Sequence, residues 1–315
     1  MEIEEVSYSV YQNVLSQPTH LFGSAEFSEL NRSKCESLHY LLFKDTKYRL
    51  GLVGGIRNGL FLSPFSAPFG GFSFVKSDVR IGYIDESLDL LLDWAKNKRL
   101  SGIRITLPPT IYDETFIAKQ VNCLFRKGFE IQNIDLNYSF LVKKFHSEYL
   151  TEILWRNARK NLNASLKSNL TFEVAQSEEQ KSEAYQIIKQ NREARGFPLR
   201  MSWDAMWSTM QIVPHDCFLV VDGEQQNIAS AMVFHVTPEV VQVIYWGDLP
   251  QYSALKTMNF LAYSLFGYYA KSDIKIIDIG PSTEDSIPNY GLCEFKEGLG
   301  CDVTSKLTMV FNLNR

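Results

Sequence analysis

The sequence has few of the residues that cross-link a chain or bind metals. It contains five cysteines and five histidines, and no two cysteines are spaced as Cys-x-x-Cys. An odd number of thiols without that spacing disfavours a disulfide framework and a structural zinc site. The histidines show no metal-ligand spacing either. We therefore expect no metal.

Three motifs that would reveal a reaction class are also missing. No Gly-x-Gly-x-x-Gly follows a strand, and neither Gly-x4-Gly-Lys-Ser/Thr nor Gly-x-Ser-x-Gly occurs. The first two cradle phosphates, and the third exposes a nucleophilic serine. Their absence disfavours a dinucleotide-binding enzyme, a nucleotide hydrolase and a serine hydrolase.

The chain has no excess of positive charge and no long apolar run. Its 32 Lys and Arg against 36 Asp and Glu give a net charge of −4, which does not favour nucleic acid or an anionic membrane as a partner. The most apolar segment, 260–270, is too short for a membrane span of ~20 residues. The first residues are acidic, unlike a signal peptide. We expect a cytoplasmic protein with no membrane span.

The 315 residues suffice for two domains, and strand and helix periodicities alternate along them. In the first half, a strand at 48–57 should turn at Asn58-Gly59 into a second strand, because Asn-Gly between apolar runs is a strong hairpin signal. The pattern then predicts a helix, a strand, a helix and a strand at 86–98, 103–107, 114–127 and 136–142.

The second half repeats this order, with a helix at 254–270, a strand at 274–279, a short helix ending at Gly298 and a strand at 306–313. A further strand is expected at 240–246, and two helices, at 147–167 and 178–195, lie between the halves. An offset of roughly 170 residues aligns the helices, the middle strands and the last strands of the halves, which indicates an architectural duplication. We predict an α/β fold with mixed sheets in two domains packed together, residues 1–145 and 146–315.

Two segments are candidates for the wall of a binding cleft. The loop Ser63–Phe72 is stiffened by two prolines and contains Phe69 and a Gly-Gly pair; its alternative role is a packed crossover. The strand 240–246 places Tyr245 and Trp246 on opposite faces, so that Tyr245 can face a cleft while its neighbour is in the core.

A third segment carries the best candidates for chemistry. Asp278 ends an apolar strand, at the edge where α/β proteins bind ligands. Lys296 follows on a short helical turn and could stabilise a phosphate or an oxyanion; the alternative is a surface lysine that neutralises Asp278 or Glu294. The other candidate substrate contacts in this segment are Ser282, Asn289, Tyr290 and Phe295.

Basic residues recur at helical spacing between the halves. Arg159 belongs to the first of two such helices and Arg195 ends the second. Guanidinium groups bind phosphates through paired N–H donors, so a pyrophosphate or a tRNA phosphate fits these helices. A solvated helix face is the alternative interpretation.

Two motifs resemble the Fem-type branch of the acetyltransferase superfamily. They are Ile-Asp-Ile-Gly-Pro-Ser at 277–282 and Phe-Lys-x-x-Leu-Gly at 295–300, with supporting stretches at 63–72, 155–160, 191–198 and 227–231. The resemblance implies two acetyltransferase-like domains and a reaction cleft in the second. It also implies direct attack of an amine on an activated acyl donor, without an acyl-enzyme. Lys296 would then stabilise the oxyanion, and Asp278 would orient the amine or accept its proton.

Two departures bear on the acyl donor. The stretch Gln251–Lys256 has no glycine where users of acetyl-CoA carry a glycine-containing pyrophosphate turn, and the chain lacks the helical hairpin of the tRNA-handling enzymes. Acyl-CoA and aminoacyl-tRNA both stay open as donors. The hypothesis is acyl or aminoacyl transfer to the amine of a cell-envelope precursor or a similar small molecule. The alternatives are an inactive binding or scaffold protein that keeps the double fold, and a module that binds tRNA or another RNA.

Overall fold

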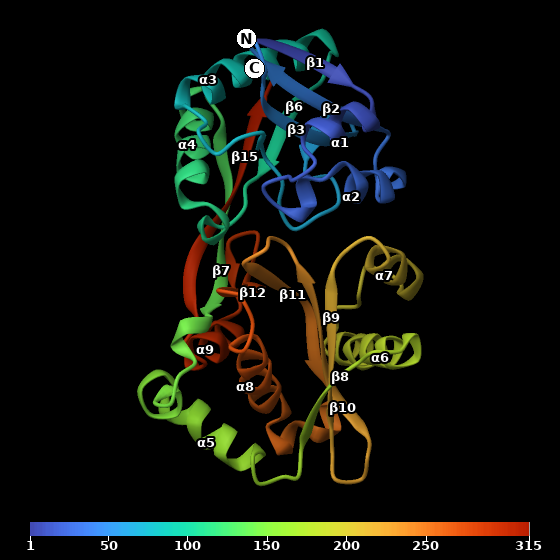
Figure 1. Cartoon of the computed structure of the whole chain (residues 1–315), viewed down its shortest axis with the longest axis vertical. Coiled ribbons are helices and arrows are strands. Elements are labelled where there is room, and N and C mark those ends of the chain that lie inside the picture. Colours follow the sequence, from blue (N-terminus) through green and yellow to red (C-terminus); the bar gives the residue numbers. More distant parts are fainter. Residues whose placement is uncertain (315) are drawn as a thin grey trace. The chain divides into compact units, whose positions relative to one another are not determined.

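The computed structural model describes residues 1–314, which form two compact units (Figure 1). Unit 1 contains residues 1–136, 285–287 and the chain from 304 onward, and unit 2 contains residues 137–284 and 288–303. Strands β7 (Glu130–Leu141) and β15 (Asp302–Asn312) each contribute residues to both units.

Unit 1 is built on a sheet of mostly antiparallel strands. Its order is β1, β2, β3, β4, β6, β15, and β4 and β6 are parallel. Asn58 and Gly59 have φ of 53° and 73° and make the predicted hairpin between β3 and β4. The strands are β1 (Glu2–Val6), β2 (Ser37–Lys44), β3 (Tyr48–Arg57), β4 (Leu60–Ser63), β5 (Ser73–Phe74) beside β3, and β6 (Gly102–Thr106).

Helices pack on the sheet of unit 1 through apolar stripes. In α3 (Ile81–Asn97), which begins before the predicted residue 86, Ile84, Leu88 and Leu91 recur on one face and join the main core. Asp113 caps α4 (Glu114–Arg126) by accepting a hydrogen bond from the Phe116 amide at 2.9 Å. A second cluster lies under α1 (Tyr8–Val14) and α2 (Ala25–Leu30).

Unit 2 has a sheet in the order β7, β12, β11, β10, β9, β8, to which β7 contributes residues 137–141. Strands β11 and β12 are parallel and the other neighbours are antiparallel. The strands are β8 (Thr171–Val174), β9 (His215–Val221), β10 (Asn227–His235), β11 (Val240–Asp248) and β12 (Ile276–Pro281), followed by the short β13 (Thr283–Glu284) and β14 (Ile287–Pro288).

Helices α6 (Glu178–Ala194) and α8 (Thr257–Tyr269) cover opposite faces of this sheet (Figure 1). The Ser230 hydroxyl donates to the Ala184 carbonyl of α6, whereas Phe218, which pairs with Ala231, packs edge-on against Tyr269 of α8. Consecutive strand residues thus reach different helices. The other helices of unit 2 are α5 (Arg156–Ser165), α7 (Trp203–Met210) and α9 (Tyr290–Gly298).

The predicted helix 147–167 is wrong in its first turns. Residues 149–153 form a π-helical turn, Leu154 is extended with ψ of 131°, and α5 begins only at Arg156. The Trp155 amide donates to the Gly298 carbonyl instead of extending a helix. Burial of Tyr149, whose hydroxyl donates to the Leu299 carbonyl, fixes this turn against the end of α9.

The two units exchange their last strands, which differs from the predicted boundary at 145. In unit 1, β15 pairs with β6 and places Thr308 opposite Thr106. In unit 2, β7 pairs with β12 and places Phe140 opposite Ile277. β7 and β15 are therefore equivalent as predicted, but the strand from each half of the sequence completes the sheet of the other unit. No helix within residues 1–314 is long and apolar enough to cross a bilayer.

Candidate functional site

The site is built where two parallel strands of unit 2 separate. The ladder between β11 and β12 runs from the pair Val240 and Ile276 to the pair Gln242 and Asp278. Beyond it, β11 continues to Asp248 and β12 to Pro281, and the registers of both with their other neighbours shift. The ladder between the two strands therefore ends at Asp278.

Asp278 is completely buried, and its carboxylate accepts hydrogen bonds from side-chain amides and from the backbone. Asn137 Nδ2 donates at 2.7 Å, Gln242 Nε2 at 2.8 Å and the Gly280 amide at 2.8 Å. Charge-assisted hydrogen bonds of this kind fix both oxygens of a carboxylate. The geometry therefore presents Asp278 in a single orientation.

The residues around Asp278 leave several buried polar atoms unsatisfied. Within residues 1–314, Asn137 Oδ1, Ser139 Oγ, Gln242 Oε1 and Ser282 Oγ have no hydrogen-bond partner. A buried polar atom without a partner costs about 1–3 kcal/mol, so such a cluster is unusual in a packed core. Two of the four are amide oxygens, which accept only. The cluster is suited to a ligand that carries N–H groups.

Strand alternation places this cluster and Lys296 on opposite faces of the sheet. Ser139 lies opposite Asp278 and Gln242 beside it, so their side chains share one face. Tyr138 belongs to the other face, where its ring lies 5.4 Å from Lys296 Nζ. The side chains of Asp278 and Lys296 therefore lie at the end of β12 on opposite faces of the sheet.

Lys296 is buried, so it is not the surface lysine of the alternative interpretation. Its ammonium donates to the carbonyls of Ile279 at 2.9 Å, Gly280 at 2.8 Å and Pro281 at 3.0 Å. Burial lowers its pKa to about 8, and nearby Asp278 opposes that shift. An ammonium has three N–H donors, and all are used. To stabilise an oxyanion as predicted, Lys296 must replace its hydrogen bond to one of these carbonyls by a hydrogen bond to the oxyanion.

The other predicted residues of this region lie on β11, at the start of α9 and within α9. The Asn289 amide donates to the Ser282 carbonyl at 2.9 Å, and the Asn289 side chain caps α9. Phe295 packs edge-on against Trp246 with ring centroids 6.0 Å apart, while Tyr290 is 75% exposed. Tyr245 is half-buried on β11, and burial raises its pKa, which Arg192 opposes. The Asn289 side chain therefore has a structural role as the N-cap of α9.

Three predicted residues lie elsewhere. Arg159 on α5 donates to the Thr151 carbonyl at 3.5 Å, and exposed Arg195 lies 3.8 Å from Asp248. Phe69 is fully buried in unit 1 and packs against His20, Phe22 and Tyr112. Its position corresponds to a packed crossover, the alternative role of that loop, and not to an aromatic cleft wall.

Sequence reasoning missed Asn137, Ser139 and Gln242. Asn137 and Ser139 alternate with Tyr138 and Phe140, which is also the pattern of a strand with one solvated face. Gln242 gives a clearer signal, because it interrupts the apolar run Val-Val-Gln-Val-Ile. A polar residue in the middle of such a run predicts a buried partner.

The start of α8 does not present an open anion site. Asp248 is 5% exposed, and its carboxylate accepts from Thr257 Oγ1 at 2.6 Å and from Asn191 Nδ2 at 3.2 Å. A carboxylate beside the first turn of a helix competes with a phosphate for that position. Over residues 1–314, no group of His, Cys, Asp and Glu side chains is arranged to hold a metal ion.

Comparison with known proteins identifies the fold. No model of a protein family matches the sequence, and no curated protein matches it significantly. Among solved structures, FemX aligns with a TM-score of 0.70 at 14% identity and covers 100% of this chain and 98% of its own. L-PGS from Bacillus licheniformis aligns at 0.63 and 13% identity, covering 99% and 94%.

A tandem GNAT protein from the clavulanic acid biosynthesis pathway aligns with a TM-score of 0.54 at 8% identity and covers 99% of this chain and 98% of its own. At such low identities the likeness shows the fold alone. The chain has the tandem acetyltransferase-like fold of the Fem type. This confirms the fold that the sequence resemblance implies.

Proposed function

We propose that this protein transfers an acyl or aminoacyl group from an activated donor to an amine. The observation that carries the proposal is the buried cluster around Asp278, where the carboxylate and two unsatisfied amide oxygens meet at the parting of β11 and β12. An attacking amine needs acceptors for its N–H groups and for the proton it loses. The fold, which FemX and a tandem GNAT protein share, supports the same chemistry.

The proposed reaction is a direct displacement. The amine nitrogen attacks the acyl carbonyl carbon, the C–N bond forms, and the bond to the leaving group breaks with its electron pair. The proton of the amine passes to Asp278, directly or through a water. Lys296 stabilises the oxyanion after it releases one of its three carbonyl acceptors. Positioning and oxyanion stabilisation then supply most of the rate enhancement.

The proposed substrates are those that the resemblance to Fem-type proteins implies. Acyl-CoA and aminoacyl-tRNA are the candidate donors, and Asp248 beside the start of α8 argues against a pyrophosphate held there. The proposed acceptor is the amine of a cell-envelope precursor or a similar small molecule. Tyr245, with Arg192 nearby, is proposed to contact the substrate on the α6 side of the sheet.

A binding assay and a turnover assay test the proposal together. Thermal unfolding is followed with acyl-CoAs, free CoA, aminoacyl-tRNA and UDP-linked precursors; a ligand at 100 times its Kd adds about 2.7 kcal/mol of stability. The hits are then assayed for amide formation. We expect Asp278→Asn to lower turnover by about 10²-fold and to keep the fold, because an amide retains the shape but accepts no proton.

The matched control is Asp273→Asn, an exposed position in the same unit, which should leave turnover unchanged. Full turnover in Asp278→Asn would rule out its proposed role.

A second candidate function is a binding protein without catalysis, favoured because all three N–H donors of Lys296 are already used. Saturable binding of an acyl donor and an amine together, with no product, would select it.

A further inference from the structure

The surface of unit 1 has a hollow of about 250 Å³ at the start of β3. Its walls are formed by Tyr48 of β3, by Tyr83 of α3 and by three valines, Val14, Val75 and Val79. A volume of this size suits a small metabolite rather than a polypeptide. The hollow lies entirely in unit 1 and shares no residue with the site around Asp278.

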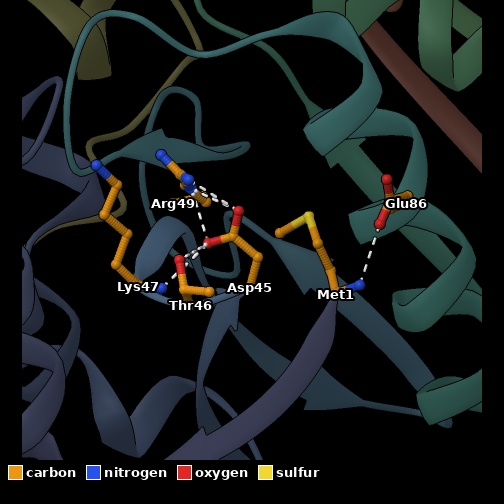
Figure 2. Close-up of polar contacts among 6 residues, drawn as sticks. All are labelled: Met1, Asp45, Thr46, Lys47, Arg49 and Glu86. Carbon is orange, nitrogen blue, oxygen red and sulfur yellow. Dashed lines mark hydrogen bonds and ion pairs between the residues drawn. The ribbon is translucent and has the colours of Figure 1, made fainter.

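An arginine on one side of the hollow is held in place from two directions. Arg49 Nε and Nη2 donate to the Asp45 carboxylate, with Nη2 at 2.8 Å from Oδ2, and the guanidinium lies 4.6 Å from the centre of the Tyr83 ring. Figure 2 shows this pair with Lys47 beside it. A guanidinium has five N–H donors, and these contacts leave Nη1 without a partner within residues 1–314.

Two lysines add to the positive charge around the same hollow. Lys47 and Lys76 are exposed lining residues, and neither ammonium forms an ion pair within the described chain. The lining carboxylate is Asp78, and Asp45 is already engaged by Arg49. Three cations around one hollow repel each other and attract an anion placed between them.

We propose that this hollow binds a small organic anion, in which a carboxylate or a phosphate is attached to an aromatic or aliphatic body. The body packs between the tyrosine rings and the valines, and the anion is bound by Arg49, Lys47 and Lys76. Arginine suits the anion because its planar fork matches both oxygens of a carboxylate or phosphate. The site is independent of the transfer reaction proposed above.

The test uses the full chain and four probes of similar shape, namely benzoate, phenyl phosphate, benzyl alcohol and benzylamine. Binding is followed by amide chemical shifts and calorimetry. We expect an anion to bind at least ~10-fold more tightly than benzyl alcohol, and benzylamine to bind worst, since charge complementarity separates them. The tighter of the two anions identifies the headgroup. Equal affinity for benzoate, phenyl phosphate and benzyl alcohol would overturn the proposal.

Two variants place the binding in the hollow. Lys47→Ala combined with Lys76→Ala should weaken anion binding by about 10-fold without affecting the fold, because both side chains are exposed. Val14→Trp should fill the hollow and abolish binding of every probe. The control, Lys271→Ala on the surface of unit 2, should change nothing. Anion binding that survives in both lining variants would contradict the assignment.

Discussion

Helix α4 of unit 1 and helix α9 of unit 2 occupy equivalent places in the duplicated architecture, yet they bury different chemistry. Gln120 follows the N-cap Asp113 at the same spacing as Lys296 follows the N-cap Asn289, and both side chains are 1% exposed. Gln120 Oε1 accepts one hydrogen bond, from the Phe72 amide at 3.0 Å. Lys296 donates three, all to carbonyls at the end of β12.

The two positions differ in what burial costs. A neutral amide that closes a loop satisfies a backbone group at little cost. A buried ammonium carries a large desolvation penalty, which its hydrogen bonds to the three carbonyls have to offset. The unsatisfied atoms near Asp278 add to that cost. At these two equivalent positions, unit 1 therefore buries a neutral amide and unit 2 buries an ammonium, with unsatisfied polar atoms at the same strand end.

The largest effect is expected from Lys296→Met. It removes the donor from three buried carbonyls, which should lower the free energy of unfolding by about 3 kcal/mol or more. If the ammonium also binds the oxyanion, turnover should fall by about 10²-fold. Urea denaturation measures the first effect, and single-turnover kinetics on folded protein measures the second. A variant with full stability would show that the three hydrogen bonds contribute nothing.

The next largest effect is expected from His20, a buried base in unit 1 whose protonation makes the stability of the fold depend on pH. Burial lowers the pKa of His20 from 6.5 to about 4. Between those values the unfolded chain binds a proton that the folded chain does not, so stability is lost as the pH falls from 6.5 to 4 and levels off below it. The loss attributable to His20 is about 3 kcal/mol at most.

The measurement for His20 is urea denaturation from pH 7 to pH 4, compared with His20→Leu. The wild-type protein should lose stability relative to the variant across that window, because leucine does not titrate. Parallel pH profiles for the two proteins would show that His20 does not control this loss. Like the Lys296 experiment, this one compares a buried base with an apolar replacement.

The smallest effect is expected from Gln120→Ala. It leaves the Phe72 amide without its acceptor and should cost about 1–2 kcal/mol of unfolding free energy. Turnover of the folded protein should stay at the wild-type level. Thermal unfolding and the amide-formation assay check both statements. A loss of activity as large as that of Lys296→Met would contradict the assignment of a purely structural role to Gln120.

Much of the fold follows from local pattern. The Asn58-Gly59 hairpin and helix α4 appear where turn chemistry and periodicity predict them, and α3 covers most of its predicted range but begins five residues earlier. The π-helical turn at 149–153 does not, because its form depends on contacts with Gly298 and Leu299, far along the chain. Local propensity carries no information about such distant partners.

The candidate site was predictable in part. The sequence pointed to Asp278 as the end of an apolar strand and to Lys296 on the short helical turn that follows, within a Phe-Lys motif. It did not show that they approach from opposite faces of the sheet, nor that Asn137 and Gln242 hold the carboxylate. Those partners come from β7 and β11, and only the sheet register brings them to Asp278.

The sequence by itself determined the alternation of strands and helices, the duplicated order and the resemblance to a tandem acetyltransferase-like fold. Only the tertiary structure decided which sheet each last strand joins. Apolar residues alternate in the same way along β7 and β15, so the pattern allows each strand to complete either sheet. Long-range pairing with β12 and β6 resolves that ambiguity, and with it the surroundings of Asp278.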